Sequence, residues 1–108
     1  MKKRTSTWQV MSKVEWTQTA LDDLAGIRAY IARDSVYYAN KFVDEAFRAV
    51  ERLEMFPESG RIIPERNDPS FREIIFGSYR IMYKIANDEC FITTMIHGKR
   101  NYIVNQNE

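Results

Sequence analysis

Three apolar runs in the second half of the chain restrict its fold more than any other feature. They occupy residues 71–76 (FREIIF), 79–85 (YRIMYKI) and 90–97 (CFITTMIH), and β-branched and aromatic side chains dominate them, as is typical of strands. Gly77-Ser78 and Asn87-Asp88-Glu89 separate the runs, and these residue types favour tight turns. The pattern therefore predicts a meander of three antiparallel strands.

Two helices are predicted before this meander. Thr17 or Thr19 can cap the first helix, and Asp34 or Ser35 can cap the second. Because the connection between the helices is short, they should form an antiparallel hairpin. Apolar residues recur in both segments at the spacing of one helical face: Ala20, Leu24, Ile27 and Ile31, then Ala39, Phe42, Val43, Ala46, Val50 and Leu53.

Two further segments complete the expected architecture. Residues 13–17 (KVEWT) predict a short first strand, whereas residues 56–70 contain all three prolines and predict a surface connection. We therefore expect an α+β fold, in which the helical hairpin packs on one face of a mainly antiparallel sheet of three to four strands. Gly26 lies inside the first helix, where glycine costs about 1 kcal/mol relative to alanine, so we expect it to pack closely against a neighbouring element.

The length of 108 residues fits one domain, residues 1–108, with a flexible basic start over residues 1–13. A single cysteine, Cys90, excludes an internal disulfide and fits a reducing compartment. No apolar run follows the basic start, and no stretch approaches 18 apolar residues. We therefore expect a soluble, cytoplasmic protein that has no contact with a membrane.

The net charge of +1 shows no overall positive field of the kind that marks many nucleic-acid-binding proteins. Charge is nevertheless divided along the chain, because residues 14–70 carry a net of −4 and residues 71–104 a net of +2. This division is compatible with one acidic face and one basic face.

The first two strands of the meander carry two arginines, Arg72 and Arg80. If Gly77-Ser78 is a two-residue turn, alternation places Arg80 on one face with Glu73 and Met82, and Arg72 on the other. We expect Arg80 to point outward, and we expect the two arginines not to converge unless a bulge changes the register. The more apolar face should meet the helices; it carries Ile74, Ile81, Tyr83 and Ile85.

No Gly-rich phosphate loop and no HExxH, GxSxG or CxxC motif occurs, and we expect neither a metal nor a cofactor. Ribonuclease chemistry without a metal needs a base, an acid, and cations for the charge that builds on phosphorus. Arginines can supply the cations, and His97, Tyr102 and Glu73 are the candidates for proton transfer. The alternative for the arginines is a surface or ion-paired position, and for the histidine a structural one.

Four segments, in this order, resemble the RelE/ParE superfamily of toxins from bacterial type II toxin–antitoxin modules. The resemblance covers the chain from Val14 to Tyr102, and the long helices and the P-x-S-G exit of the second helix are more similar to the ParE branch than to the shorter RelE form. The segments are VEWTQTALDDLAGIRAYI, RLEMFPESGR, FREIIFGSYRIMYKI and ITTMIHGKR.

The RelE branch implies a ribosome-dependent mRNA endoribonuclease. On this reading Arg80 and Arg100 fall on arginine positions of the site, Arg72 falls near a lysine position, and the candidate catalytic set also includes His97 and Tyr102. Ile74 departs from the pattern, because the ribonuclease branch carries a second lysine there.

The ParE branch implies inhibition of DNA gyrase, with Arg80 and Arg100 as supports or partner contacts. We expect this ParE-like function; the alternatives are a RelE-like ribonuclease and a degenerate toxin that only binds its antitoxin. The resemblance also implies a cognate antitoxin, bound in an apolar groove of a toxin–antitoxin hetero-oligomer, with gyrase or the ribosome and its mRNA as the target.

Overall fold

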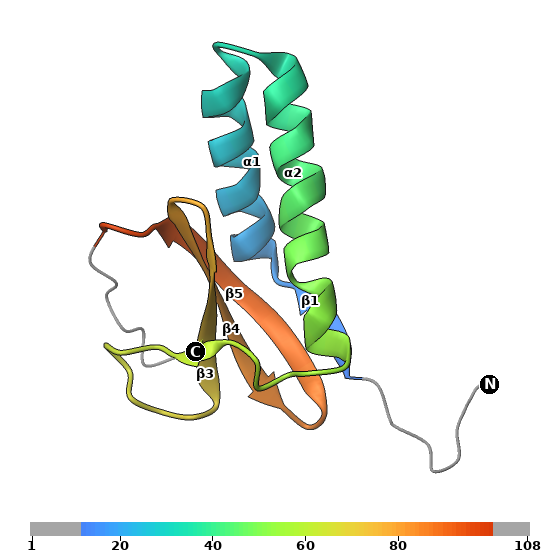
Figure 1. Cartoon of the computed structure of the whole chain (residues 1–108), viewed down its shortest axis with the longest axis vertical. Coiled ribbons are helices and arrows are strands. Elements are labelled where there is room, and N and C mark those ends of the chain that lie inside the picture. Colours follow the sequence, from blue (N-terminus) through green and yellow to red (C-terminus); the bar gives the residue numbers. More distant parts are fainter. Residues whose placement is uncertain (1–11, 101–108) are drawn as a thin grey trace, which may run out of the picture.

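The computed structural model describes residues 12–100, and Figure 1 shows a helical hairpin beside a twisted sheet. This arrangement confirms the expected α+β class. Residues 1–11 of the predicted basic start lie outside the described residues. The elements in chain order are β1 (Lys13–Trp16), α1 (Gln18–Ala32), α2 (Val36–Ala49), the 3₁₀ helix η1 (Glu51–Glu54), β2 (Arg61–Ile62), β3 (Phe71–Phe76), β4 (Tyr79–Ala86) and β5 (Glu89–His97).

The strands form one five-stranded sheet in the order β1-β5-β4-β3-β2. β1 pairs with β5 in parallel, and the other pairs are antiparallel. The sheet has one strand more than the expected three to four, because Arg61 and Ile62 of the connection pair with the edge of β3. Two residues carry too little periodicity to reveal a strand in the sequence.

The two turns of the meander use residues that tolerate a positive φ. Gly77 has φ +57°, and glycine reaches this region without the clash that a Cβ would cause. Asn87 and Asp88 have φ 51° and 61°, and asparagine and aspartate are the residues that reach it most often after glycine. The register of β3 and β4 is the one predicted for a two-residue Gly77-Ser78 turn.

Both helices begin at a side-chain cap. The Thr17 hydroxyl accepts a hydrogen bond from the Ala20 N–H (3.2 Å) and donates one to the Ile92 carbonyl (2.8 Å). The Ser35 hydroxyl accepts a hydrogen bond from the Tyr38 N–H (3.2 Å). Since Thr17 bonds to both α1 and β5, it fixes the start of the hairpin on the sheet.

The main core lies between the hairpin and one face of the sheet, which is the apolar face expected from alternation. Ile85 packs against it from the same face. The buried members of this core are Ala20, Leu24, Ala46, Val50, Leu53, Ile74, Ile81, Tyr83, Cys90, Ile92 and Met95.

No helix among residues 12–100 has the length and apolar character that crossing a membrane requires.

A bulge changes the faces of the last residues of β5. The register between β4 and β5 shifts at Met82 and Tyr83, and this leaves Thr93 as an extra residue in β5. As a result, His97 lies opposite Tyr79 on the face that the helices cover.

The opposite face of the sheet has a smaller buried cluster. It consists of Ile63, Phe71 and Met82, with Ile96 packed against it. Ile63 belongs to the connection between β2 and β3, which lies across the sheet from the helices (Figure 1). This connection therefore covers part of the second face.

The expectation that Gly26 packs closely against a neighbour was wrong. A Cβ placed on Gly26 would meet nothing within 4 Å. Gly60 is packed most closely among the four glycines, because a Cβ there would lie 2.6 Å from the Tyr83 hydroxyl and 2.7 Å from the Glu73 carbonyl oxygen. The Gly60 N–H donates to the Tyr83 hydroxyl (2.9 Å), which itself donates to the Pro57 carbonyl (2.7 Å).

Candidate functional site

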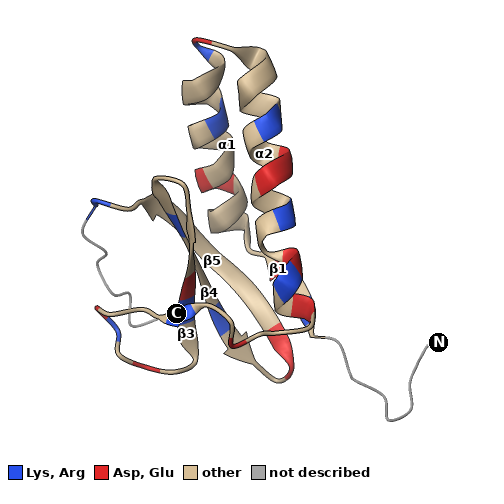
Figure 2. Cartoon of the chain, viewed as in Figure 1, with Lys and Arg blue, Asp and Glu red and all other residues tan. Residues whose placement is uncertain are grey.

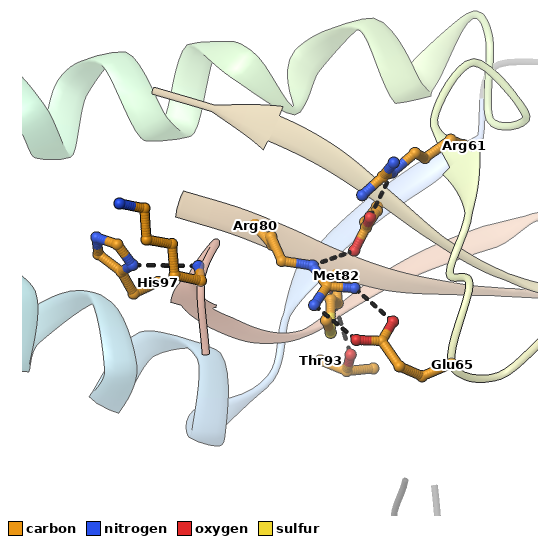
Figure 3. Close-up of polar contacts among 8 residues, drawn as sticks. Arg61, Glu65, Arg80, Met82, Thr93 and His97 are labelled. Carbon is orange, nitrogen blue, oxygen red and sulfur yellow. Dashed lines mark hydrogen bonds and ion pairs between the residues drawn. The ribbon is translucent and has the colours of Figure 1, made fainter. Parts of the chain in front are cut away.

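Arg80, in β4, is the centre of an ion-pair cluster on the sheet face away from the helices (Figure 3). Its Nε donates to Glu73 Oε1 (2.7 Å), and its Nη1 and Nη2 donate to the two carboxylate oxygens of Glu65 (2.9 and 2.7 Å). Arg61 Nε donates to the other oxygen of Glu73 (2.5 Å). All three guanidinium nitrogens of Arg80 therefore bond to carboxylates.

The two central side chains of this cluster have almost no contact with solvent. The exposed fraction of the side chain is 6% for Arg80 and 0% for Glu73, against 34% for Glu65 and 57% for Arg61. Hydrogen bonds to Glu65 raise the pKa of Arg80; burial opposes this rise, and Glu73 adds to it. The guanidinium consequently stays protonated over the ordinary pH range.

Arg80 lies on the predicted face but does not point outward to solvent. Its neighbours on this face are Glu73 and Met82, as the register predicted. The β2–β3 connection folds over the same face, because burial of Ile63 beside Met82 stabilises that position. The connection brings Glu65 onto the guanidinium, so the expectation of an outward-pointing Arg80 was wrong.

Two shallow cavities adjoin His97, near the turn between β3 and β4. The first has a volume of about 280 Å³, and its lining includes Arg61, Tyr79, Arg80, His97, Gly98 and Lys99. The second has a volume of about 370 Å³ and lies beside α1; its lining includes Asp22, Asp23, Gly26, Tyr30, His97 and Arg100. The structure thus brings His97 next to both arginines, while Arg80 and Arg100 line different cavities.

His97 is exposed, and within residues 12–100 it contacts Lys99 and Tyr79. Its Nδ1 accepts a hydrogen bond from the Lys99 N–H (3.2 Å), and its ring lies edge-on to Tyr79, with 5.5 Å between ring centroids. An Nδ1 that accepts this hydrogen bond carries no proton itself. These contacts fit a structural residue, and within residues 12–100 they involve the Nδ1 side and the ring face but not Nε2.

Arg72 lines neither of the two cavities that adjoin His97. Its Nε donates to the Pro69 carbonyl (2.9 Å), and its Nη1 donates to the carbonyls of Glu58 (3.1 Å) and Gly60 (3.0 Å). These bonds fasten the connection before β3 to the sheet. Arg72 and Arg80 do not converge, as the register predicted.

The remaining candidates have different outcomes. Glu73 is fully buried and binds two arginines, so it holds Arg80 in place and does not face a substrate. Tyr102 lies outside the described residues.

The role of Glu65 had no signal in the sequence, because this glutamate lies in a proline-containing connection, 15 residues from Arg80. Within residues 12–100, no three or more His, Cys, Asp or Glu side chains gather as metal ligands would.

Comparison with known proteins identifies relatives that match most of the chain. Residues 14–102 match the family described as ParE toxin of type II toxin-antitoxin system, parDE. The chain is also 32% identical, over 91 residues, to Toxin RelE2 of Caulobacter vibrioides; the match covers 83% of this chain and 99% of that protein.

Two solved structures share the fold. The chromosomal ParDE TA system from P. aeruginosa aligns with a TM-score of 0.67 at 21% identity, over 81% of this chain and 96% of that one. The toxin-antitoxin complex RelBE2 from Mycobacterium tuberculosis aligns with a TM-score of 0.52 at 23% identity, over 82% of this chain and 99% of that one. The helical hairpin, the sheet and the match over residues 14–102 agree: the chain belongs to the ParE toxin family of type II toxin–antitoxin systems, within the RelE/ParE superfamily.

Proposed function

We propose that this toxin inhibits DNA gyrase, as the ParE branch does, and that a cognate antitoxin neutralises it. Membership of the family makes the chain a type II toxin, and the state of Arg80 carries the choice of target. In the ribonuclease branch, an arginine at this position belongs to the RNA site. Here its guanidinium is buried and bonded to two carboxylates.

A guanidinium in this state is a poor phosphate ligand. To bind a phosphate, Arg80 would have to give up two charge-assisted hydrogen bonds to Glu65. The phosphate would then lie near the charge of Glu73, whose Oε1 is 2.7 Å from Arg80 Nε. Ile74, in place of a second lysine, removes another cation. Both features support the gyrase proposal over the ribonuclease alternative.

A RelE-like ribonuclease is the second candidate function, and one observation favours it. The cavity of about 280 Å³ is lined by Arg61, His97 and Lys99, which can supply positive charge and a proton donor or acceptor. Arg100 lines the neighbouring cavity. Such a group of side chains can bind a phosphodiester without Arg80.

We also propose that this toxin binds a cognate antitoxin, which neutralises it. Both structural neighbours are described as toxin–antitoxin assemblies. Ile75 is an exposed apolar side chain in the part of β3 that the two-residue edge strand β2 does not pair. A strand or helix of the antitoxin would remove this apolar surface from water.

Two assays on one preparation of the toxin separate the candidates. Purified gyrase is assayed for supercoiling, and mRNA ends are mapped in a translating extract. We expect inhibited supercoiling, relief of the inhibition by the product of the adjacent reading frame, and no new mRNA ends.

The double variant His97→Ala, Arg100→Ala makes the same distinction by mutation, because both residues are exposed and their loss should leave the fold intact. We expect this variant to inhibit gyrase and growth as the unmodified chain does. Ribosome-dependent cleavage that the double variant loses would overturn the gyrase proposal. Antitoxin binding without either activity would identify a degenerate toxin.

A further inference from the structure

The end of the helical hairpin exposes apolar side chains that the rest of the fold leaves in solvent. We call residues 28–41, the second half of α1 and the first half of α2, the hairpin tip. The exposed fractions are 65% for Tyr30, 57% for Val36, 70% for Tyr37 and 61% for Tyr38. Three of the six tyrosines of the chain therefore lie at the tip.

The fold does not require aromatic side chains at this position. The main core cluster includes no residue from 28 to 41, a range that the structure describes completely, and Figure 1 shows this end of the hairpin extending beyond the sheet. The two helices are joined there by other groups: Ala39 is fully buried, and Arg28 donates two hydrogen bonds to Asn40 Oδ1 (3.1 and 2.8 Å).

The exposed tyrosines pack against other residues of the tip. The rings of Tyr37 and Tyr38 meet edge to face, with 5.2 Å between centroids. The Arg33 guanidinium lies 5.6 Å from the centroid of the Tyr30 ring. The aromatic surface is thus partly ordered by its own neighbours, which lowers the entropy that a partner must remove on binding.

This surface is large enough to form the centre of a protein interface. A tyrosine side chain can bury about 200 Å², so Tyr37 and Tyr38, which are in contact and are 70% and 61% exposed, offer roughly 260 Å², and Tyr30 adds area on the neighbouring helix. One partner in a standard interface contributes about 800 Å². Tyrosine and arginine are also among the residues that contribute most to binding at such interfaces.

The tip is basic, although the remainder of the hairpin is not (Figure 2). Residues 28–41 contain Arg28, Arg33 and Lys41 against Asp34, a net of +2, whereas residues 42–54 carry a net of −2. A symmetric dimer through two tips would bring like charges together. The charge therefore favours an acidic partner over a second copy of this chain.

A protein partner fits the tip better than a nucleic acid does. Nucleic-acid affinity depends on the number of phosphates that cations neutralise, and the tip has three cations, of which Arg28 is already bonded to Asn40. A tyrosine-rich end that projects beyond the sheet can enter a recess on a protein surface, and aromatic residues are enriched at protein interfaces.

We propose that the hairpin tip is the surface with which this toxin docks on its protein target, in an apolar recess with an acidic rim. This inference rests on the proposed function only for the identity of the target, which is gyrase. The surface and the chemistry of the recess follow from the exposure, the composition and the charge of the tip.

The test uses the full chain with Tyr30→Ser, Tyr37→Ser and Tyr38→Ser combined. The matched control is Phe56→Ser, because Phe56 is as exposed as Tyr38, at 61%, but follows the opposite end of α2. We expect the triple variant to bind purified DNA-free gyrase at least about 30-fold more weakly and to lose growth arrest. The control should keep both properties, and circular dichroism should show all three proteins folded.

A second variant tests the charge of the tip. Arg33→Glu with Lys41→Glu reverses two exposed cations, and we expect the association rate to fall about tenfold and to depend less on salt concentration. An association rate that stays unchanged would overturn the acidic rim as part of the proposal.

The remaining outcomes separate this inference from the proposed function. Equal gyrase binding by a folded triple variant would overturn the tip while gyrase inhibition stands. If the unmodified chain does not bind gyrase, the proposed function fails, and growth arrest by a Tyr37→Ser, Tyr38→Ser variant decides the tip, because this variant keeps Tyr30 and the cavity that Tyr30 lines. Lost arrest in this variant supports the tip, and unchanged arrest overturns it. Loss of antitoxin binding, of duplex DNA binding or of a dimer in the triple variant would assign the surface to another occupant and overturn the proposal.

Discussion

Glu73 and Arg80 are charged side chains that the fold removes almost completely from water. Transfer of a charge out of water costs several kcal/mol, and opposite charges at hydrogen-bond distance must offset this cost. Glu73 bonds to Arg61 and Arg80, and Arg80 bonds to Glu73 and Glu65. Removal of the buried partner, Glu73 or Arg80, would leave the charge of the other unbalanced where water cannot replace the lost group.

Neutralising Glu73 should therefore destabilise the protein much more than neutralising Glu65. We expect Glu73→Gln to lower the free energy of unfolding by about 3 kcal/mol. Glu65→Gln should lower it by about 1 kcal/mol, because the Glu65 side chain is 34% exposed and water can replace it in part. Urea denaturation at pH 7 measures both values.

The matched control for this prediction is Arg61→Gln, at the solvent-exposed end of the cluster. It should change stability by less than about 1 kcal/mol. Equal losses for Glu73→Gln and Glu65→Gln would contradict the view that burial of Glu73 governs the cluster.

Two buried groups should make stability fall at alkaline pH. Burial raises the pKa of Cys90 above its ordinary value of 9.0 and the pKa of Tyr83 above its ordinary value of 10.0. The unfolded chain then loses these protons at lower pH than the folded chain, so the free energy of unfolding is unaffected below the ordinary values and falls as pH rises above them. We expect the fall to begin near pH 9.

Urea denaturation between pH 7 and pH 10.5 checks this prediction. The double variant Cys90→Ala, Tyr83→Phe should be less stable at pH 7, because Tyr83 bonds to Gly60 and Pro57, but its stability should decline less with pH. An equally steep decline in the double variant would attribute the effect to other groups.

Helix α1 and the connection before β3 each contain a glycine, and the surroundings of the two glycines are opposite. Gly26 has open space at its Cβ position and lines the cavity beside Arg100. Gly60 contacts the Tyr83 ring and the backbone of β3 so closely that a Cβ cannot enter without movement. Gly26 thus lowers the stability of helix α1 although no neighbouring group requires a glycine there. The connection, in contrast, needs Gly60 in order to pack against Tyr83 and β3.

Alanine at these two positions should have effects of opposite sign. Gly26→Ala should raise the free energy of unfolding by about 1 kcal/mol, because alanine is the better helix former. Gly60→Ala should lower it by about 2 kcal/mol or more, since the added methyl group forces Tyr83 or β3 to shift. Each variant is the control for the other in one set of urea denaturation curves. A destabilised Gly26→Ala would mean that α1 does need its glycine.

The protein as a unit combines a sheet that is covered on both faces with a helical hairpin that is anchored at one end. The helices cover one face, and the β2–β3 connection covers part of the other. The hairpin tip contributes nothing to either buried cluster. Substitutions at the tip should therefore alter binding without altering the core.

Antitoxin binding and tip substitution should consequently be independent. At a free antitoxin concentration of about 100 Kd, we expect the free energy of unfolding to rise by about 2.7 kcal/mol, both in the unmodified chain and in the triple tyrosine variant. Thermal unfolding with and without the antitoxin measures this rise. A much smaller rise in the triple variant would mean that the antitoxin itself covers the tip.

Local patterns in the sequence were enough to predict the strands of the meander, the hairpin, and the faces of Arg72 and Arg80. Each of these depends on residues that are neighbours in the chain: the Gly77-Ser78 turn sets a register, and Thr17 and Ser35 cap their own helices. The resemblance to the RelE/ParE superfamily likewise follows from short segments in a constant order, and the family match confirms it.

Contacts between distant residues determined the burial of Arg80, the pairing of β2 and the open surroundings of Gly26. Alternation showed which face Arg80 occupies, but Glu65, 15 residues earlier, determines whether that face is free. The connection takes this position because Ile63 and Phe71 bury apolar surface on the sheet. Burial and ion pairing of this kind depend on the position of the whole chain in space, and the periodicity of a strand or helix records only the direction in which each of its own side chains points.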